Sequence, residues 1–309
     1  MALSPIKKIA IGMAALCVAI TIMTANSLQA LVLAKASINI SNFVAGAASD
    51  GTSGSGEGEE AEISAGEKGD AGVSKEEEEQ MLQDMLESGD AELDESGNIV
   101  VKTPETTEEI VEYYKKALNN AKENGKDVVR VKDGAINYKG VVRAGGLSSV
   151  AESLMGMFMA SSADAIEDTN VEWKASDLPP AGVSCNLTAA GVKDAKIEDD
   201  GEYFIITIVA NDCKNPKAGD DGVGSISSVI EESQITGAIG SVPGLALTNI
   251  ALEYEEVTAI ATVHKASGRL VGLTTSSPCY LSLDAKLALI SINDACVGIQ
   301  VISEFTVSY

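Results

Sequence analysis

The chain has 309 residues, and 46 acidic against 22 basic residues give it a formal net charge of −24. It lacks the Lys/Arg clusters that nucleic acid and anionic lipid headgroups require, which argues against both as partners. The single histidine, His264, excludes His-rich metal sites and most Ser–His or Cys–His catalysis, and we expect it at the surface. No phosphate-binding loop, dinucleotide pattern or nucleophile elbow is present, so we predict neither a cofactor nor an enzyme.

The N-terminus carries an export pattern. Lys7 and Lys8 precede an uncharged apolar run, and Ala34-Lys35-Ala36 offers small residues at the spacing of a signal-peptidase site. Because the uncharged run reaches Ala34, an uncleaved membrane anchor at residues 9–34 is the alternative to a cleaved signal. We therefore predict an exported protein of the cell surface or the extracellular space, whose residues 1–36 engage the membrane and the Sec pathway.

Residues 37–100 have the composition of a spacer. Gly, Ser and Glu dominate, and 17 acidic residues against two lysines lie between Asp50 and Glu95. Such a segment cannot bury enough apolar surface to offset its ordering entropy, and its like charges extend it. We predict a disordered acidic tether with one short helix near 75–88, which begins at a capping box of Ser74 and Glu77. Weak cation binding or repulsion from an anionic wall is the functional alternative.

Helical patterns follow the spacer. Thr106 and Glu109 form a second capping box before apolar residues at helical spacing, which predicts a helix over about Pro104–Glu123. The patterns of Leu147–Ser162 and Ser225–Ile239 predict two more helices. Four apolar residues of the middle helix either pack in the core or line an apolar pocket: Met155, Met157, Phe158 and Met159.

The remaining apolar runs alternate as strands do. Val192–Glu198 and Glu202–Asn211 flank Asp199-Asp200-Gly201 and predict a hairpin. From Leu245 the chain predicts a meander of four or five antiparallel strands, with a turn at Ile292–Ala295 before the last strand. The odd positions of that last strand are apolar, and its even positions are expected to face water. We predict a single α+β domain over 101–309, in which an antiparallel sheet of six to eight strands carries about three helices, mostly on one face.

Four cysteines lie outside the export signal: Cys185, Cys213, Cys279 and Cys296. In an exported chain they permit two disulfides, and their spacing disfavours zinc. If Ile290 pairs with Val297 across the last turn, Cys279 lies far from Cys296. Cys185 and Cys213 flank the middle hairpin almost symmetrically, so we expect a bond between them, with four free thiols as the alternative.

Several stretches, taken in order, resemble those of known proteins: Glu109–Ala117, Leu187-Thr188, Tyr203–Ile208, Asn215-Pro216 and the closing meander. Together they resemble uncharacterised exported proteins of Gram-positive anaerobic bacteria over about Glu108–Tyr309. Their order is also similar to that of LolA/LppX-like lipoprotein carriers. That second resemblance implies a curved, half-barrel sheet with an apolar cavity between sheet and helices. Neither resemblance assigns a functional residue.

Three functions remain open on the sequence. The first is an exported cell-surface binding or structural module with a partner in the cell envelope. The second is an extracytoplasmic carrier of an apolar or lipid ligand, which the predicted strand Tyr203–Ala210, largely apolar on both faces, and the Met-rich helix suggest. The third is a secreted hydrolase that uses convergent carboxylates. We expect the module, because ordinary helix packing satisfies two-sided burial as well as a ligand cavity does.

Overall fold

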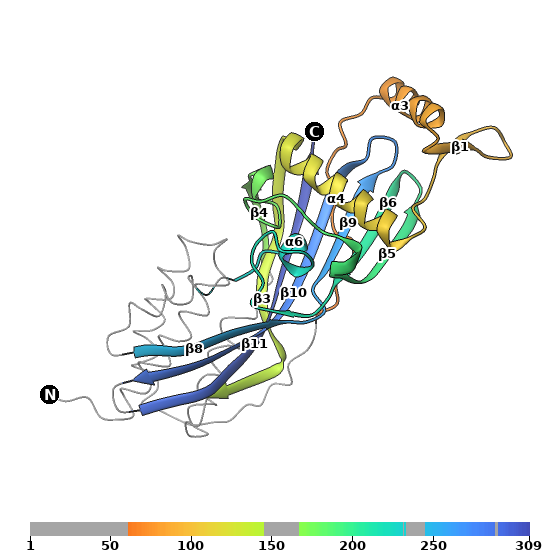
Figure 1. The fold of residues 1–309 in the computed structure, drawn as a ribbon. Coiled ribbons are helices and arrows are strands. Elements are labelled where there is room, and N and C mark those ends of the chain that lie inside the picture. Colours follow the sequence, from red (N-terminus) through yellow and green to blue (C-terminus); the bar gives the residue numbers. More distant parts are fainter. Residues whose placement is uncertain (1–60, 145–166, 231, 233–244, 288–289) are drawn as a thin grey trace.

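The computed structural model describes residues 61–144, 167–230, 232, 245–287 and 290–309. Within these ranges the dominant feature is a nine-stranded antiparallel sheet, with helix α4 across one of its faces (Figure 1). The strand order is β4-β3-β11-β10-β9-β6-β5, and β8 pairs with both β10 and β7. This arrangement confirms the predicted α+β class.

The described strands of this sheet have the following bounds: β3 (Asp127–Ala144), β4 (Glu167–Trp173), β5 (Val192–Asp200), β6 (Tyr203–Ala210), β7 (Cys213–Lys214), β8 (Leu245–Tyr254), β9 (Thr258–His264), β10 (Arg269–Leu287) and β11 (Ile290–Ser308). The predicted hairpin is β5–β6, and the predicted meander is β8 to β11. The strand β3 includes both Val128–Val131 and Ile136–Val142. A separate two-stranded hairpin joins β1 (Ala91–Leu93) to β2 (Ile99–Val101).

Both predicted capping boxes are present. The Thr106 hydroxyl accepts a hydrogen bond from the Glu109 N–H at 3.2 Å, and α4 (Thr107–Asn124) begins there. Ser74 and Glu77 do the same for α3 (Lys75–Ser88). Short helical turns form η1 (Ala175–Asp177), η2 (Ala189–Gly191) and α6 (Val223–Ile226).

Of the two other predicted helices, one lies outside the described residues and the other is partly wrong. Leu147–Ser162, with Met155, Met157, Phe158 and Met159, lies outside the described residues. The helix predicted from Ser225 is wrong over Ser227–Ile230, because α6 ends at Ile226 and the chain continues there without helical structure.

The turn predicted at Ile292–Ala295 is also wrong. β10 and β11 form one long hairpin in which Leu287 lies opposite Ile290 and Leu281 opposite Val297. Asn293 and Asp294 instead form a bulge, where Asp294 has a φ of 57° and donates its N–H to the Asp284 carboxylate at 2.8 Å. Asn and Asp tolerate left-handed backbone, so they serve a bulge as well as a turn.

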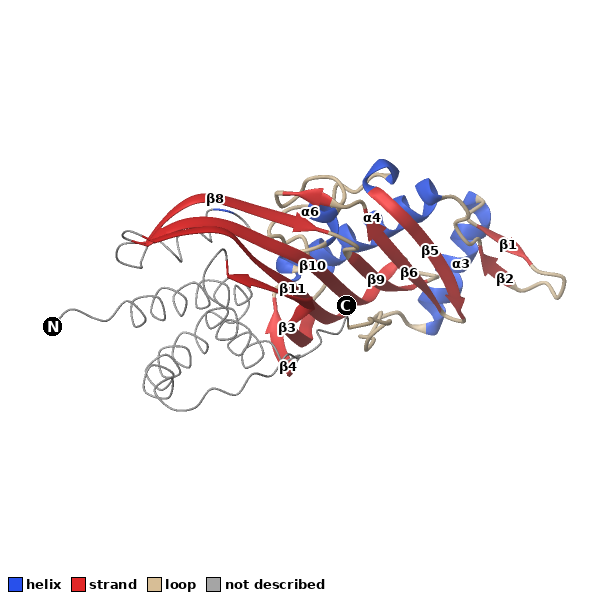
Figure 2. Cartoon of the chain, turned by 90° about the horizontal axis from the view of Figure 1, so that it is seen from below, coloured by secondary structure: helices blue, strands red, loops and turns tan. Residues whose placement is uncertain are grey.

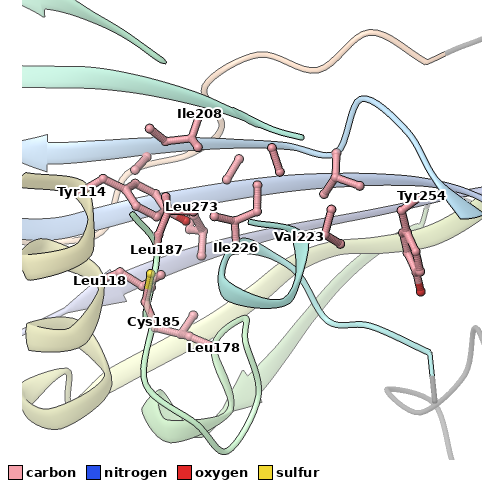
Figure 3. Close-up of a cluster of buried hydrophobic side chains, with 14 of the residues drawn as sticks. Tyr114, Leu118, Leu178, Cys185, Leu187, Ile208, Val223, Ile226, Tyr254 and Leu273 are labelled. Atoms are coloured by element: carbon pink, nitrogen blue, oxygen red, sulfur yellow. The ribbon is translucent and has the colours of Figure 1, made fainter. Parts of the chain in front are cut away.

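The core lies between α4 and the face of the sheet that it covers, which we call the inner face. Tyr114 and Leu118 of α4 are fully buried, as are Phe204, Ile206 and Ile208 of β6. Figure 3 shows the neighbouring side chains of this cluster, including Leu178, Leu187 and Leu273. The inner positions of β9 are small, Ala259, Ala261 and Val263, and all three are fully buried. In this half of the molecule, apolar side chains fill the space between sheet and helix.

Beyond β9 the sheet continues as an arm, defined here as β8 with the adjoining halves of β10, β11 and β3 (Figure 2). β10 pairs with β9 up to Ser276 and with β8 from Cys279. Pro278 sits at this change of neighbour, and its carbonyl accepts from the Glu255 N–H at 3.3 Å. The N–H and C=O of a strand residue point to the same side, so the missing proline N–H takes no bond from the β10–β11 ladder.

Candidate functional site

An N-terminal segment covers the outer face of the sheet, the one opposite α4. Residues 61–72, which we call the strap, follow β11 from Gln300 to Tyr309 in the same direction. At one end the Gln300 amide exchanges two hydrogen bonds with the backbone of Ala61, at 3.0 and 2.9 Å. At the other end the Tyr309 N–H donates to the Asp70 carbonyl at 3.1 Å. The strap therefore gives part of the predicted acidic spacer a fixed place on the sheet.

A buried carboxylate holds the middle of the strap. Glu304 accepts from the Glu67 N–H at 2.7 Å and from the Lys132 ammonium at 2.9 Å. The hydrogen bond and charge of Glu304 raise the pKa of Lys132. The even positions of the last strand were expected to face water, yet Gln300, Ile302 and Glu304 are all buried. That prediction is wrong because the strap lies over this row.

Glycine is required where the strap meets the sheet. Gly66, Gly69 and Gly72 recur every third residue. A Cβ atom would lie 2.1 Å from a Glu304 carboxylate oxygen at Gly66, 2.1 Å from the Val307 carbonyl at Gly69 and 2.5 Å from the Tyr309 carbonyl at Gly72. An extended chain with a three-residue period presents every third residue to the same side. The same glycines that give the spacer its low-complexity composition therefore allow close backbone approach.

Cationic side chains fix the rest of the strap. Lys68 pairs with Asp200 at 2.8 Å and lies 4.3 Å from the ring centre of Tyr203. Arg269 donates to the Ala71 carbonyl at 2.6 Å, and its guanidinium lies 4.9 Å from the ring centre of Tyr309. Backbone and side-chain contacts thus join the strap to four strands, β5, β6, β10 and β11.

His264 lies at the end of β9, near the place where α3 follows the strap. It is only 7% exposed, so its predicted surface position is wrong. Its Nδ1 lies 2.9 Å from the Ser267 hydroxyl, and its Nε2 lies 3.8 Å from the Glu78 carboxylate of α3. Within the described residues no group of His, Cys, Asp and Glu side chains is arranged to hold a metal ion.

A polar cluster spans the sheet where the arm begins. The Glu255 carboxylate accepts from Lys139 and from the Tyr280 hydroxyl, both at 2.9 Å. Burial and the neighbouring Glu255 raise the pKa of Tyr280 to about 12. Burial acts against ionisation of Glu255, but the bonds from Lys139 and Tyr280 hold its pKa below the usual value. Glu255 follows β8 and Lys139 lies in a bulge of β3, so the cluster ties the two sides of the arm together.

Glycine and a bulge make room for this cluster. Gly298 of β11 lies opposite Tyr280, and a Cβ on it would be 2.4 Å from the Tyr138 carbonyl. Lys139 and Gly140 have positive φ values of 52° and 64°, as the bulge in β3 requires. The ring of Tyr138 lies 5.6 Å from that of Tyr280.

The inner face contains a buried ion pair. Arg130 and Asp133 of β3 are joined at 3.1 Å, and both side chains are only 2% exposed. The Ser303 hydroxyl donates to Asp133 at 2.7 Å, and the Arg130 guanidinium lies 4.3 Å from the Trp173 ring centre. Burial lowers the pKa of Arg130, and the charge of Asp133 opposes that shift. Trp173 is the last residue of the edge strand β4.

The positions of the buried carboxylates bear on catalysis. Among the described residues, Asp133 and Glu304 are the two acidic side chains that are buried. Asp133 lies opposite Ser303, and Glu304 lies opposite Lys132. Since neighbouring strand residues point to opposite faces, these two carboxylates lie on opposite sides of the sheet. Each is already ion-paired, and the two cannot reach one substrate together.

The predicted Cys185–Cys213 disulfide is not formed, because all four described cysteines are free. Cys185 is buried beside Leu118 and Leu178, under α4 (Figure 3). Cys213 belongs to β7 and lies opposite Tyr254 of β8. The two residues flank the hairpin symmetrically in sequence, but the chain takes them to different layers of the fold.

The register of the last hairpin separates the other two cysteines. Cys279 lies opposite Ile299, and Cys296 lies opposite Ser282. The two therefore point to opposite faces, although the register differs from the predicted one. Burial raises the pKa of Cys185 to about 11 and that of Cys279 to about 12.

No protein-family model, curated protein or solved structure matches the chain. The resemblances drawn from the sequence therefore stay predictions. None of the described helices is both long and apolar enough to cross a membrane.

The strap can be tested through Gly69. A Gly69→Ala variant places a methyl group against the Val307 carbonyl, so we expect the strap to lift. The free energy of unfolding should fall by about 1–3 kcal/mol, as it does for other overpacked sites. Cleavage by a Glu-specific protease at Glu67 should become faster. Ala65→Ser, at an exposed strap position, should change neither quantity. Equal cleavage of Gly69→Ala and the parent chain would contradict this account.

The thiols can be tested by alkylation. At pH 8 a thiol with a pKa of about 11 has only about 0.1% thiolate, so Cys185 and Cys279 should react far more slowly than the partly exposed Cys213. All sites should react alike in denaturant. Folding raises the pKa values of these two thiols. Their contribution to the free energy of unfolding should therefore be fully present below about pH 9 and should be lost as the pH rises toward 12. Mass spectrometry of non-reduced peptides that found a Cys185–Cys213 link would overturn the assignment.

Proposed function

We propose that the chain is an exported module of the cell surface, which is held by its N-terminal segment and acts by binding or by structure. The observation that carries the proposal is the strap. The segment that leads from the apolar N-terminal run does not join the domain at a free end. Gln300, Glu304 and Arg269 bind this segment, which follows β11, an interior strand of the sheet.

This attachment suits a tethered module. The described part of the strap begins at Ala61, which binds Gln300 close to the beginning of the arm. The acid-rich α3 and the β1–β2 hairpin follow the strap at its other end, beyond Gly72. The tether residues Glu57, Glu59 and Glu60 are themselves acidic, so acidic segments adjoin the strap at both of its ends. An anionic envelope would repel both segments, which suits a tether that holds the domain away from it.

The polar groups also favour a module over a hydrolase. The buried carboxylates Asp133 and Glu304 are each neutralised by a cation, and they lie on opposite faces of the sheet. Glu255 is engaged by Lys139 and Tyr280. Hydrolysis by paired carboxylates needs two such groups on the same side of one cleft.

Localisation tests the proposal. We expect a C-terminally tagged chain in the membrane or wall fraction of expressing cells, and its domain should be digested when intact cells are treated with protease. Reversing the charges with Lys7→Glu and Lys8→Glu should retain the chain in the cytoplasm, since export signals need a positive N-terminal region. The matched control, Lys116→Glu with Lys126→Glu at exposed positions of the domain, should leave export intact. A parent chain found in the cytoplasm with an intact N-terminus would refute the proposal.

A carrier of an apolar ligand is the second candidate, and the inner face of the arm favours it. Apolar residues continue along this face from β10 and β11 to β8: Leu281, Leu283, Val297, Ile299, Ile250 and Leu252. A carrier needs an apolar wall of this kind.

Extraction separates the two candidates. Organic extraction of the purified native chain followed by mass spectrometry should find no stoichiometric lipid if the chain is a module. Near-stoichiometric lipid that is lost in Leu283→Gln, but kept in the outer-face variant Ser282→Gln, would establish the carrier instead.

A further inference from the structure

The edges of the sheet differ in how they are protected. Edge strands expose unpaired backbone groups, and proteins guard them with charges, bulges or short length. β5 carries Lys, Asp and Glu at most of its positions, and β4 has acidic residues with a left-handed Asn170. The edge of β3 in the arm has the bulge at Lys139 and the charge of Arg143. In contrast, β8 has no charged residue from Leu245 to Leu252.

The chain closes only one end of the β8 edge. β7 pairs with Glu253 and Tyr254, and Asn215 then binds Leu252. The Asn215 N–H donates to the Leu252 carbonyl, and its side-chain oxygen accepts from the Leu252 N–H, both at 2.8 Å. These bonds show that the backbone groups of Leu252 point toward the edge. By alternation, those of Ile250 point the same way.

Among the described residues, the rest of the β8 edge has no partner strand. In the described part of the chain, no strand pairs with β8 on this side before Glu253. Ala246, Thr248 and Asn249 are exposed. Figure 2 shows β8 as the outermost strand of the arm. One extra residue at Thr248 interrupts the pairing with β10. Between Thr248 and the bonds of Asn215, Asn249–Ala251 forms a regular run in which the backbone groups of Ile250 face the edge.

The net negative charge of the chain limits the surfaces through which two copies can associate. With a net charge of −24, two copies repel each other across most surfaces, and the acidic edges β4 and β5 repel directly. An uncharged antiparallel edge is free of that repulsion and is self-complementary about a two-fold axis. We propose that the open edge of β8 pairs with β8 of a second copy, so that the two arms form one continuous sheet. The apolar inner faces at Ile250 and Leu252 would then adjoin. This inference does not depend on export.

Sedimentation velocity of the full-length chain tests the pairing. The parent chain should show a concentration-dependent dimer. Thr248→Lys brings two like charges to the shared edge and should raise the dimer dissociation constant at least about tenfold. Ser96→Lys adds the same charge in the exposed loop between β1 and β2 and should leave the constant unchanged. Because both variants keep residues 1–60, association through the N-terminal segment affects them equally.

Cross-linking gives a second readout. Asn249→Cys should form an interchain disulfide under mild oxidation, whereas Ser96→Cys should not, and both variants retain the native thiols. A parent chain that stays monomeric, equal dissociation constants for Thr248→Lys and Ser96→Lys, or equal cross-linking of the two cysteine variants would each overturn the proposal. If Thr248→Lys melts well below the parent chain in circular dichroism, the cysteine pair alone decides.

Discussion

The burial of the polar side chains on the outer face of the sheet depends on the hydrogen bond from the Glu67 N–H to the Glu304 carboxylate. A buried carboxylate without donors costs several kcal/mol, so Glu304 can be buried only because Lys132 and the strap both serve it. With the strap in place, the polar side chains of the outer row pair with backbone instead of water. The strap then continues into α3, which covers His264. This buried acid, with Gln300 and Arg269, joins the N-terminal segment to the last two strands.

The long strands β10 and β11 raise a different problem, because each changes environment along its length. One half faces α4 and the other half belongs to the arm. The transition is marked by residues that cannot complete a regular ladder, Pro278 and Gly298, opposite a bulge in β3. Glu255, Lys139 and Tyr280 bind one another across this line. The irregular backbone and the polar cluster therefore act together. They allow β10 to continue as one strand where its partner changes from β9 to β8.

Local signals in the sequence predicted the parts of the fold that local physics determines. The capping boxes at Ser74 and Thr106 marked two helix starts because side chain and backbone satisfy each other within four residues. The runs that flank Asp199-Asp200-Gly201 predicted the β5–β6 hairpin, and alternation predicted the C-terminal meander, because successive strand residues face opposite sides of a sheet. Where a residue type serves two structures, the prediction failed. Asn293-Asp294 suits a turn and a bulge equally, and the glycines of the strap suit a flexible chain and a close contact equally.

The candidate site could not be predicted in full because it depends on contacts between residues that are far apart in the sequence. The burial of His264 depends on α3, which is far away in sequence, and the separation of Cys185 from Cys213 depends on which layer each enters. The three-residue period of Gly66, Gly69 and Gly72 was the one signal that could have revealed the strap. It is easily missed within a segment that is rich in glycine throughout.

The direction of the strap has a mechanical consequence. Because it follows β11 in parallel, tension applied at residue 60 along the strand axis loads the contacts at Gln300, Glu304 and Val271 together, in shear. Tension applied perpendicular to the sheet would instead break them one after another, beginning at Ala61. A domain pulled along its own β11 should therefore resist far more force than the same domain pulled away from its outer face.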